Sequence, residues 1–442
     1  MVPELLAERS DALVVLPSGP AFAEFQADRL EFFRRCAETA GAVATRLGPD
    51  DVIVVSRPEL VNDVLVANRA DFSKSYLSDL MHPLLAGSLL LADSDSWLRE
   101  RRLVLPAFHH DRLAGYGDVM RDEAAQMAGE WAGGRRDVHA DFMRMTLRVV
   151  TRTLFGVDFA DGVGVAEGLV STLMDEFNRR IGGRRTTLPM PSLRFLRVVR
   201  ALRDLDRIAY RAIEERRRRP AGDLLSMLVE ARDENGRPMT DREIRDACIA
   251  VFFAGHETTA CLLSWTSFVL ATRPDVQERV RTELEAAGTD RAPASLPSRT
   301  PYTQAVLSEV LRLFPPAYAF GRRAVRATRV GPHSIAAGVT VLMSPWAMHR
   351  DPQVFEDPEE FRPERWLDGL ASRLPRFAYY PFSSGPRRCV GSSFALMEAT
   401  VALAVLLPRF ELAGAPAKPA AAPSITLRPA GGMHLRVRGR RG

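Results

Sequence analysis

The chain has 442 residues, 46% of them hydrophobic and 26% charged, a composition typical of a globular protein with a large core. Its formal net charge of +5 is modest and spread along the sequence, which argues against a dedicated nucleic-acid-binding protein. Four cysteines without C-x-x-C spacing argue against a disulfide scaffold and favour a reducing cytoplasm. The N-terminal sequence has no apolar run long enough to span a bilayer, so we expect no membrane anchor.

The first predicted elements are a strand and a short helix. Residues 51–55 are rich in β-branched side chains and predict a strand. A capping box from Ser56 to Glu59 then predicts a helix that runs to about Ala67.

A leucine-rich segment and a second helix follow. Residues 76–96 are broken by glycine and proline, so this segment either folds over a core or lines a ligand cavity. The helix that opens at Trp97 places Trp97 and Arg101 on one face. For such an arginine, taken alone, surface ion pairing is the simplest interpretation.

The longest predicted helix begins at a second capping box, Thr240 to Glu243, and meets no strong stop before Arg273-Pro274. At 1.5 Å per residue, its roughly 30 residues would span about 45 Å. Small residues recur along one stripe of this helix, a pattern usually explained by close helix packing. The stripe consists of Ala247, Ala250, Ala254 and Thr258.

The middle of this helix carries three unusual features. Gly255 costs about 1 kcal/mol relative to alanine in a helix interior. Glu257 and Thr258 are polar, whereas the flanking residues are apolar. A kinked or widened helix that presents an acid and an alcohol to a cavity explains all three features together.

A further helix is predicted with Thr300 as its N-cap and Pro301 as its first residue. It ends at Pro315-Pro316. Glu309 and Arg312, three residues apart, could form an exposed ion pair worth less than about 1 kcal/mol. Because the helix is strongly apolar, a buried pair is equally consistent with the sequence. A short strand is expected around residues 339–343.

The most informative segment is residues 382–391, a predicted loop that contains Cys389. This loop places Cys389 at the start of a predicted helix that ends at Pro408. The positive end of that helix, together with Arg387 and Arg388, favours a thiolate over a thiol. A thiolate in a glycine-flanked loop suits a soft metal centre, and it is an axial ligand that haem iron accepts. The alternatives are a buried structural cysteine or a redox-sensing thiol.

These motifs resemble those of the cytochrome P450 family, in the family's order and from about residue 45 to the C-terminus. The resemblance implies a mainly α fold with small β-sheets (α+β), with haem between the long central helix and the helix after Cys389. It also implies one domain over residues 1–442, with an N-terminal extension of about residues 1–45. We expect neither an anchor nor a fused redox domain.

The resemblance also assigns roles to individual residues. Cys389 would ligate the haem iron, and Thr258 and Glu257 would hold bound dioxygen and relay protons. Glu309, Arg312 and Arg365 would form a buried structural network, and Trp366, where the family more often has phenylalanine, should preserve the packing. Other haem contacts would come from Trp97, Arg101, Ala254, Phe382, Gly385, Arg387, Gly391 and Arg322, with Arg323 as an open alternative to Arg322. The substrate pocket would be lined by Leu84, Leu85, Leu89, Ala250, Val251, Ala254, Ala317, Tyr318 and Phe320.

The implied activity is that of a haem-thiolate monooxygenase, with haem b (iron protoporphyrin IX) as cofactor and O2 as co-substrate. The apolar pocket predicts a lipophilic small-molecule substrate, such as a terpenoid, a fatty-acyl chain or a polyketide, from secondary metabolism. A peroxide-driven peroxygenase would not need the acid–alcohol pair at Glu257 and Thr258. A haem-based sensor or ligand carrier would need an output domain.

The implied partners are redox proteins that pass electrons from NAD(P)H, either a ferredoxin with its reductase or a flavodoxin. Such an acidic partner is expected to dock near Cys389, attracted by Arg388 and by Arg99, Arg101 and Arg102. We expect a cytoplasmic monomer that binds no nucleic acid and does not insert stably into a membrane.

Overall fold

The computed structural model describes residues 13–74, 88–155, 193–288, 292–416 and 420–440, together with positions 168 and 172. The chain divides into two compact units. Unit 1 comprises Met1–Leu80, Ser308–Cys389 and Pro423–Leu427, and unit 2 comprises Met81–Leu307, Val390–Ala422 and Arg428–Gly442. Most of the described elements are helices, so the mainly α fold with small sheets is confirmed.

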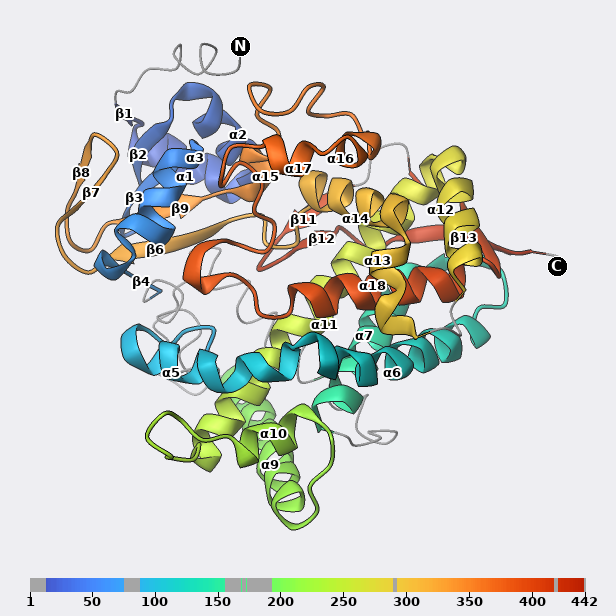
Figure 1. Ribbon diagram of the computed structural model, residues 1–442. Helices are drawn as coiled ribbons and strands as arrows, with labels where there is room; N and C mark the ends of the chain where they lie inside the picture. The colour runs from blue at the N-terminus through green and yellow to red at the C-terminus, as the bar shows by residue number, and fades with distance from the viewer. Residues whose placement is uncertain are drawn as a thin grey trace. The chain divides into compact units, whose positions relative to one another are not determined.

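Unit 1 is built on a six-stranded mixed sheet with the strand order β1-β2-β3-β9-β6-β4 (Figure 1). The β1–β2 and β3–β9 pairs are parallel, and the other three pairs are antiparallel. A separate hairpin is formed by β7 and β8. The strands are β1 (Val14–Val15), β2 (Ala42–Leu47), β3 (Asp50–Val55), β4 (Phe72–Ser73), β6 (Phe320–Ala324), β7 (Thr328–Val330), β8 (His333–Ile335) and β9 (Thr340–Met343).

The core of unit 1 lies between this sheet and short helices. Ile53, Val341 and Met343 of the sheet pack with Val61 and Val64 of the helix that follows β3. The strands predicted at 51–55 and 339–343 are thereby confirmed as β3 and β9. The helices are α1 (Ser18–Ala27), α2 (Arg29–Thr39), α3 (Pro58–Asn62) with its π-helical extension Asp63–Ala67, α15 (Pro345–Met348), α16 (Glu364–Leu367) and α17 (Leu370–Arg373).

Unit 2 is a helical assembly in which α11 packs along α7 and α18 packs along α6. A small antiparallel sheet, ordered β10-β13-β5, belongs to the same unit. Its helices are α5 (Ser94–Val104), α6 (His110–Gly129), α7 (Val138–Phe155), α9 (Leu193–Arg218), α10 (Leu224–Glu230), α11 (Asp241–Thr272), α12 (Pro274–Ala287), α13 (Leu296–Arg299) and α18 (Ser392–Leu406). Its strands are β5 (Gly134–Asp137), β10 (Phe410–Ala413) and β13 (His434–Gly439). The unit boundaries fall within or beside α14 (Pro301–Leu313), β11 (Ala421–Pro423) and β12 (Leu427–Pro429).

The long helix α11 confirms the prediction from the second capping box. The Thr240 hydroxyl accepts from the backbone N–H of Glu243, and the Glu243 carboxylate accepts from the N–H of Thr240. Among the described residues, α11 is the one helix long and apolar enough to cross a bilayer, but 78% of its most apolar window is buried. Such burial is typical of a core helix.

Two predicted helix caps are wrong, although both helices exist. Ser56 does not cap α3, because its N–H bonds to Gly41 O at 2.9 Å and keeps the chain extended up to Arg57. Thr300 does not cap α14, since its hydroxyl donates to Leu296 O. Instead, the Glu283 carboxylate of α12 accepts from the N–H groups of Tyr302 and Thr303, both at 2.8 Å. A charged acceptor suits the positive end of a helix better than a hydroxyl does.

Candidate functional site

The loop before α18 is closed by backbone hydrogen bonds in unit 1. The N–H of Cys389 donates to Phe382 O at 3.0 Å, and the N–H of Arg388 donates to Gly385 O at 3.1 Å. Gly385 has a φ of 69°, and a side chain there would begin 2.8 Å from Leu65 O. Only glycine satisfies both the left-handed backbone and this close approach, so the loop needs glycine at 385.

Of the four cysteines, Cys389 alone is exposed. Burial raises the pKa of the Cys36 and Cys248 thiols to about 12, which keeps both protonated. Cys389 lies three residues before Ser392, the first residue of α18. It is therefore the cysteine that can act as a thiolate ligand, and this donor is one that haem iron takes.

Helix α18 also carries a buried acid toward α11 within unit 2. Glu398 is 1% exposed, and burial holds its pKa well above the ordinary value. The nearby Thr259 hydroxyl of α11 lowers the pKa of Glu398, but by less than burial raises it. Neither carboxyl oxygen of Glu398 makes a hydrogen bond within the described part of the chain. A neutral carboxylic acid is consistent with such a site.

Helix α11 is buried over most of its surface but has an open stripe in its middle. Ala254 is exposed, and Val251, Gly255 and Thr258 are half-buried. The Thr258 hydroxyl donates to Ala254 O at 2.6 Å. The predicted small-residue stripe therefore has two parts. Ala247 and Ala250 are buried, whereas Ala254 is exposed and Thr258 is half-buried.

Glu257 does not face this open stripe. It is 2% exposed, and its carboxylate pairs with the guanidinium of Arg428 in unit 2 at 2.5 Å (Oε1 to Nε). The expectation that the acid faces a cavity beside the alcohol is therefore wrong for this structure. Residues one position apart on a helix point about 100° apart, and burial of Glu257 demands a partner for its charge.

Gly255 has a packing role that the sequence interpretation missed. A side chain at this position would begin 3.0 Å from Val150 Cγ2 of α7. One turn earlier along α7, the Thr146 hydroxyl donates to His256 O at 2.9 Å. α11 continues as a helix through Gly255 from Asp241 to Thr272, so the residue permits the close approach of α7 rather than ending a helical segment.

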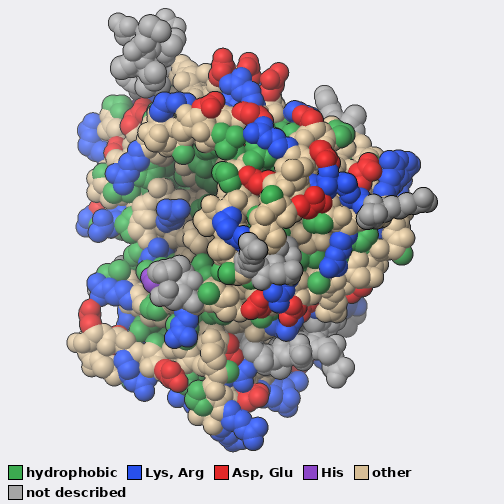
Figure 2. Space-filling model, turned by 45° about the vertical axis from the view of Figure 1, so that its right-hand side comes forward, with side chains coloured by type: hydrophobic (Ala, Val, Ile, Leu, Met, Phe, Trp, Pro, Cys, Tyr) green, Lys and Arg blue, Asp and Glu red, His purple; other side chains and the backbone are tan. Residues whose placement is uncertain are grey.

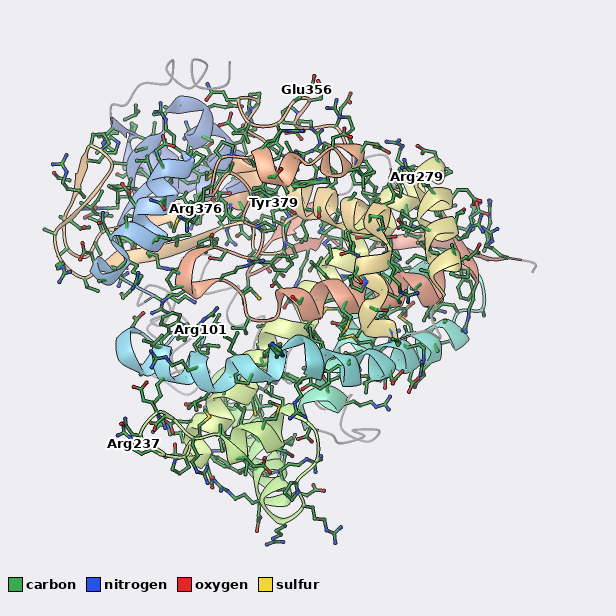
Figure 3. All side chains as sticks on the ribbon, in the orientation of Figure 1. Arg101, Arg237, Arg279, Glu356, Arg376 and Tyr379 are labelled. Carbon is green, nitrogen blue, oxygen red and sulfur yellow. The ribbon has the colours of Figure 1, made fainter. Side chains whose placement is uncertain are left out.

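The candidate propionate-binding residues are found in both units. In unit 2, the Arg101 guanidinium lies over the Trp97 ring at 5.8 Å, and both belong to α5 (Figure 3). In unit 1, Arg322 is buried, stacks near Phe320 and donates to Gly321 O. Arg323 instead pairs with Asp50 at 3.1 Å.

Glu309 is the centre of a buried network in unit 1. Its two carboxylate oxygens accept from Arg312 at 2.8 and 2.9 Å and from Arg365 Nε at 3.1 Å. Glu309 and Arg312 are fully buried, so the exposed ion-pair interpretation is wrong. Arg312 also donates to the backbone oxygens of His349 and Glu360, which ties distant loops to α14.

The network includes an aromatic donor that sequence reasoning treated as packing alone. Trp366 Nε1 donates to Glu309 Oε2 at 2.8 Å. Its ring packs on Tyr379, labelled in Figure 3, with centroids 4.5 Å apart. The signal available in the sequence was the indole N–H itself, because phenylalanine has no donor.

The predicted pocket residues are only partly covered by the structure. Leu84 and Leu85 lie outside the described residues, and Leu89 is half-buried. Tyr318 is 5% exposed and its hydroxyl donates to Ser424 O, while Phe320 packs edge-on against Tyr380. Ala317 is half-buried.

Two of the three arginines in the second half of α5 are paired with acidic side chains of unit 2. Arg99 pairs with Asp233 and Glu243, and Arg102 pairs with Glu234. Arg101, labelled in Figure 3, stacks on Trp97. Acidic side chains therefore already engage Arg99 and Arg102, and the expected docking surface on this helix stays a prediction. Basic and acidic side chains also alternate over the face shown in Figure 2.

Comparisons with known proteins converge on one family. Residues 13–435 match the family model described as Cytochrome P450. Cyclooctatin synthase of Streptomyces melanosporofaciens is 36% identical over 394 residues, which cover 87% of this chain and 85% of that protein. Cyclooctat-9-en-7-ol 5-monooxygenase of the same organism is 34% identical, covering 88% and 86%. Pentalenene oxygenase of Streptomyces avermitilis is 31% identical, covering 87% and 86%.

A solved structure agrees with these sequence relatives. The crystal structure of the cytochrome P450DA heme domain superimposes with a TM-score of 0.87 at 25% identity. The alignment covers 97% of this chain and 98% of that chain.

Proposed function

The chain belongs to the cytochrome P450 family, and from that premise we propose that it hydroxylates a terpenoid of secondary metabolism as a haem-thiolate monooxygenase. Members of the family use haem, dioxygen and reducing electrons, and they act on lipophilic substrates. The observation that carries the proposal is Cys389, the exposed cysteine in a closed loop at the start of α18.

The side chains proposed to hold haem are of the types that its iron and its propionates take. Cys389 would hold the iron, and the buried Arg322 would hold a propionate in preference to Arg323, which Asp50 already engages. Trp97, Arg101 and Arg387 are proposed as the remaining propionate contacts. When bound, haem b supplies activation of dioxygen and oxygen transfer to carbon, which no side chain can provide.

The open stripe of α11 supplies the polar group for proton handling. We propose that the half-buried Thr258 hydroxyl, which donates to Ala254 O, would accept a hydrogen bond from a water in the open stripe and so hold a proton there for the oxygen chemistry that haem would supply. Arg428 engages the Glu257 carboxylate in an ion pair, so the proposed role of Glu257 in proton relay requires that carboxylate to leave Arg428. Arg428 is therefore proposed as a positioning residue for Glu257.

The substrate assignment rests on the relatives and on apolar side chains. The printed names of three relatives refer to cyclooctatin, cyclooctat-9-en-7-ol and pentalenene. Val251 and Ala254 form the apolar part of the open stripe on α11, which suits a hydrocarbon body. A C–H or C=C bond of a terpenoid is the proposed point of oxygen insertion.

Electrons are proposed to come from NAD(P)H through a ferredoxin and its reductase, or through a flavodoxin. The organisms of these relatives are bacteria, and a cytoplasmic monomer fits that setting. Exposed Arg388, next to Cys389, is the proposed point of attraction for an acidic redox partner.

The decisive test of the ligand is the spectrum of reduced protein with carbon monoxide. The wild type should show the strongly red-shifted Soret band of thiolate ligation. Cys389→His should lose that band, whereas Cys36→Ala, which changes a buried thiol, should keep it. An unshifted band in the folded, haem-loaded wild type would overturn the assignment of Cys389.

The substrate class has its own test. Purified protein should be titrated with a panel of terpenoid hydrocarbons and alcohols, fatty acids and polyketides, while the spin state of the iron is followed. A change in the iron spin state with terpenoids, and not with fatty acids or polyketides, is the expected result. A response confined to fatty acids or polyketides would remove the terpenoid assignment and leave the haem-thiolate activity intact.

A further inference from the structure

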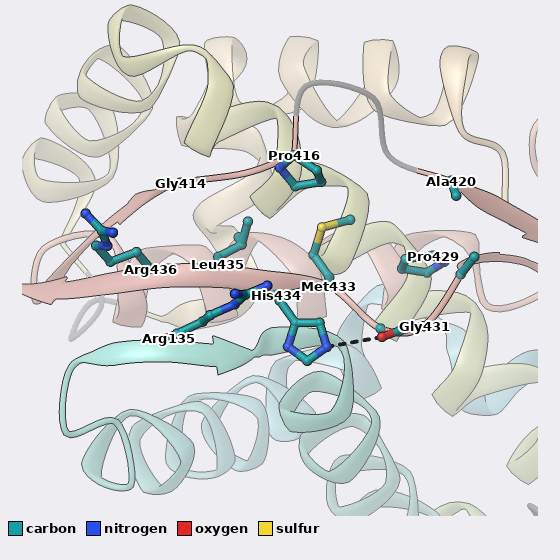
Figure 4. Close-up of a pocket in the computed structure, with 12 residues that line it drawn as sticks. Arg135, Gly414, Pro416, Ala420, Pro429, Gly431, Met433, His434, Leu435 and Arg436 are labelled. Carbon is teal, nitrogen blue, oxygen red and sulfur yellow. Dashed lines mark hydrogen bonds between the residues drawn. The ribbon is translucent and has the colours of Figure 1, made fainter.

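A second candidate site lies on the small sheet of unit 2, outside the proposed haem-binding residues. A pocket of about 360 Å³ is lined by residues of β5 and β13 and of the loops around them (Figure 4). This volume is at the lower end of the range for small-molecule pockets. Every lining residue belongs to unit 2.

Two arginines that line the pocket occupy directly opposite positions on neighbouring strands. Arg135 of β5 and Arg436 of β13 are partners in the antiparallel register, so their side chains lie on the same face. Both are exposed, and in the part of the chain that the structure describes neither guanidinium has a hydrogen bond or an ion pair. Like charges directly opposite each other destabilise a strand pair unless something neutralises them.

The neighbouring charged side chains on this face already have partners, which distinguishes the arginine pair from them. Two residues along β13, Arg438 faces Glu411 of β10 at 3.5 Å. On its β10 side, Arg436 faces Ala413. Asp137, opposite His434, already accepts hydrogen bonds from the backbone N–H groups of Met433, His139 and Ala140.

From this arrangement we propose that the pocket binds a phosphate group, either as free phosphate or as the head of a small organic phosphate. Guanidinium groups match phosphate oxygens with paired donors, and two of them neutralise a dianion. His434, held by Gly431 O at 3.1 Å, adds a third polar group to the lining. Pro416 and Pro429 supply apolar surface to the lining, which can contact an organic body (Figure 4).

The test measures thermal unfolding of the haem-loaded protein at constant ionic strength with added phosphate or phenyl phosphate. A ligand that binds the folded state raises the melting temperature in a concentration-dependent way. Both Arg135→Gln and Arg436→Gln should weaken the apparent affinity by about tenfold or more, because each removes one guanidinium from the dianion. Arg438→Gln is the matched control, since it removes an arginine from the same strand that Glu411 already neutralises, and it should bind as the wild type does.

The two probes separate the two sources of the phosphate group. Tighter binding of phenyl phosphate assigns the site to an organic phosphate, and equal binding assigns it to free phosphate. In chloride buffer, Arg135→Gln should be at least as stable as the wild type, because it removes the repulsion. No stabilisation of the wild type, or equal stabilisation of all variants, would overturn the site.

Discussion

Thr258 and Thr259 are adjacent threonines that the structure places in different environments. Thr258 is half-buried on the open stripe of α11, while Thr259 is buried and its hydroxyl donates to Gly255 O at 3.1 Å. Replacing Thr258 with alanine removes hydrogen bonds worth about 1–3 kcal/mol in a partly desolvated site. We expect Thr258→Ala to fold, to bind haem and to consume reduced nicotinamide, but to form about tenfold less product per electron pair.

The measurement is the ratio of product to NAD(P)H consumed, with hydrogen peroxide assayed alongside. Peroxide should rise as product falls. Thr259→Ala is the control, and its ratio should stay close to that of the wild type. An unchanged ratio in Thr258→Ala would make Thr258 a packing residue and favour the peroxide-driven alternative.

The buried Glu100 of α5 should make the free energy of unfolding depend on pH. It is 7% exposed, and burial, which the N–H of Leu89 only partly offsets, raises the pKa of its carboxyl from 4.5 to about 8. The unfolded chain releases this proton near pH 4.5 and the folded chain near pH 8. Folding is therefore favoured most below pH 4.5, and the free energy of unfolding falls as pH rises from 4.5 to 8.

Glu100→Gln should remove that part of the pH dependence, because glutamine does not titrate. Each unit of pKa difference between the folded and unfolded chain corresponds to about 1.4 kcal/mol. The variant should therefore be more stable than the wild type at pH 8 by a few kcal/mol. Chemical unfolding at a series of pH values measures this difference. Parallel profiles for the wild type and Glu100→Gln would contradict the buried titration.

Helix α14 depends on tertiary partners at both ends. Glu283 of α12 caps its first turn, and the Glu309 network anchors its last turns. Removing one member of a buried ion pair leaves an uncompensated charge that costs about 3–5 kcal/mol. Glu309→Ala should lower the free energy of unfolding by that amount and reduce haem content.

Trp366→Phe separates the indole hydrogen bond from ring packing in the same network. It retains an aromatic ring beside Tyr379 but loses the donor to Glu309. A hydrogen bond to a charged group contributes about 1.5–3 kcal/mol, so this variant should fall between the wild type and Glu309→Ala. Equal stability of Trp366→Phe and the wild type would mean that the indole N–H contributes nothing.

The whole molecule needs electrons from a partner, and its surface charge should govern their rate of delivery. Positive and negative side chains are mixed on the face in Figure 2, so attraction depends on local arginines and not on one broad field. Reduction by an acidic ferredoxin should slow as ionic strength rises. Arg388→Gln should lower the low-salt rate, whereas Arg102→Gln should not, because Glu234 already neutralises Arg102. A reduction rate independent of salt would contradict charge-steered docking.

The sequence alone determined those features of this protein that depend on residues close together in the chain. The capping box at Thr240, the length of α11, the Gly385 turn before Cys389 and the i, i+3 spacing of Glu309 and Arg312 are local patterns, and local patterns constrain the backbone directly. The family resemblance followed from these same motifs.

Only the tertiary structure decided which distant groups meet. Arg428 reaches Glu257 across 171 residues, Glu283 replaces Thr300 as the cap of α14, and strand register sets Arg135 against Arg436. Periodicity specifies which face of an element is buried, but it does not name the side chain packed against that face. The choice of partner comes from burial, because a charge removed from water takes the complementary group that the fold places beside it.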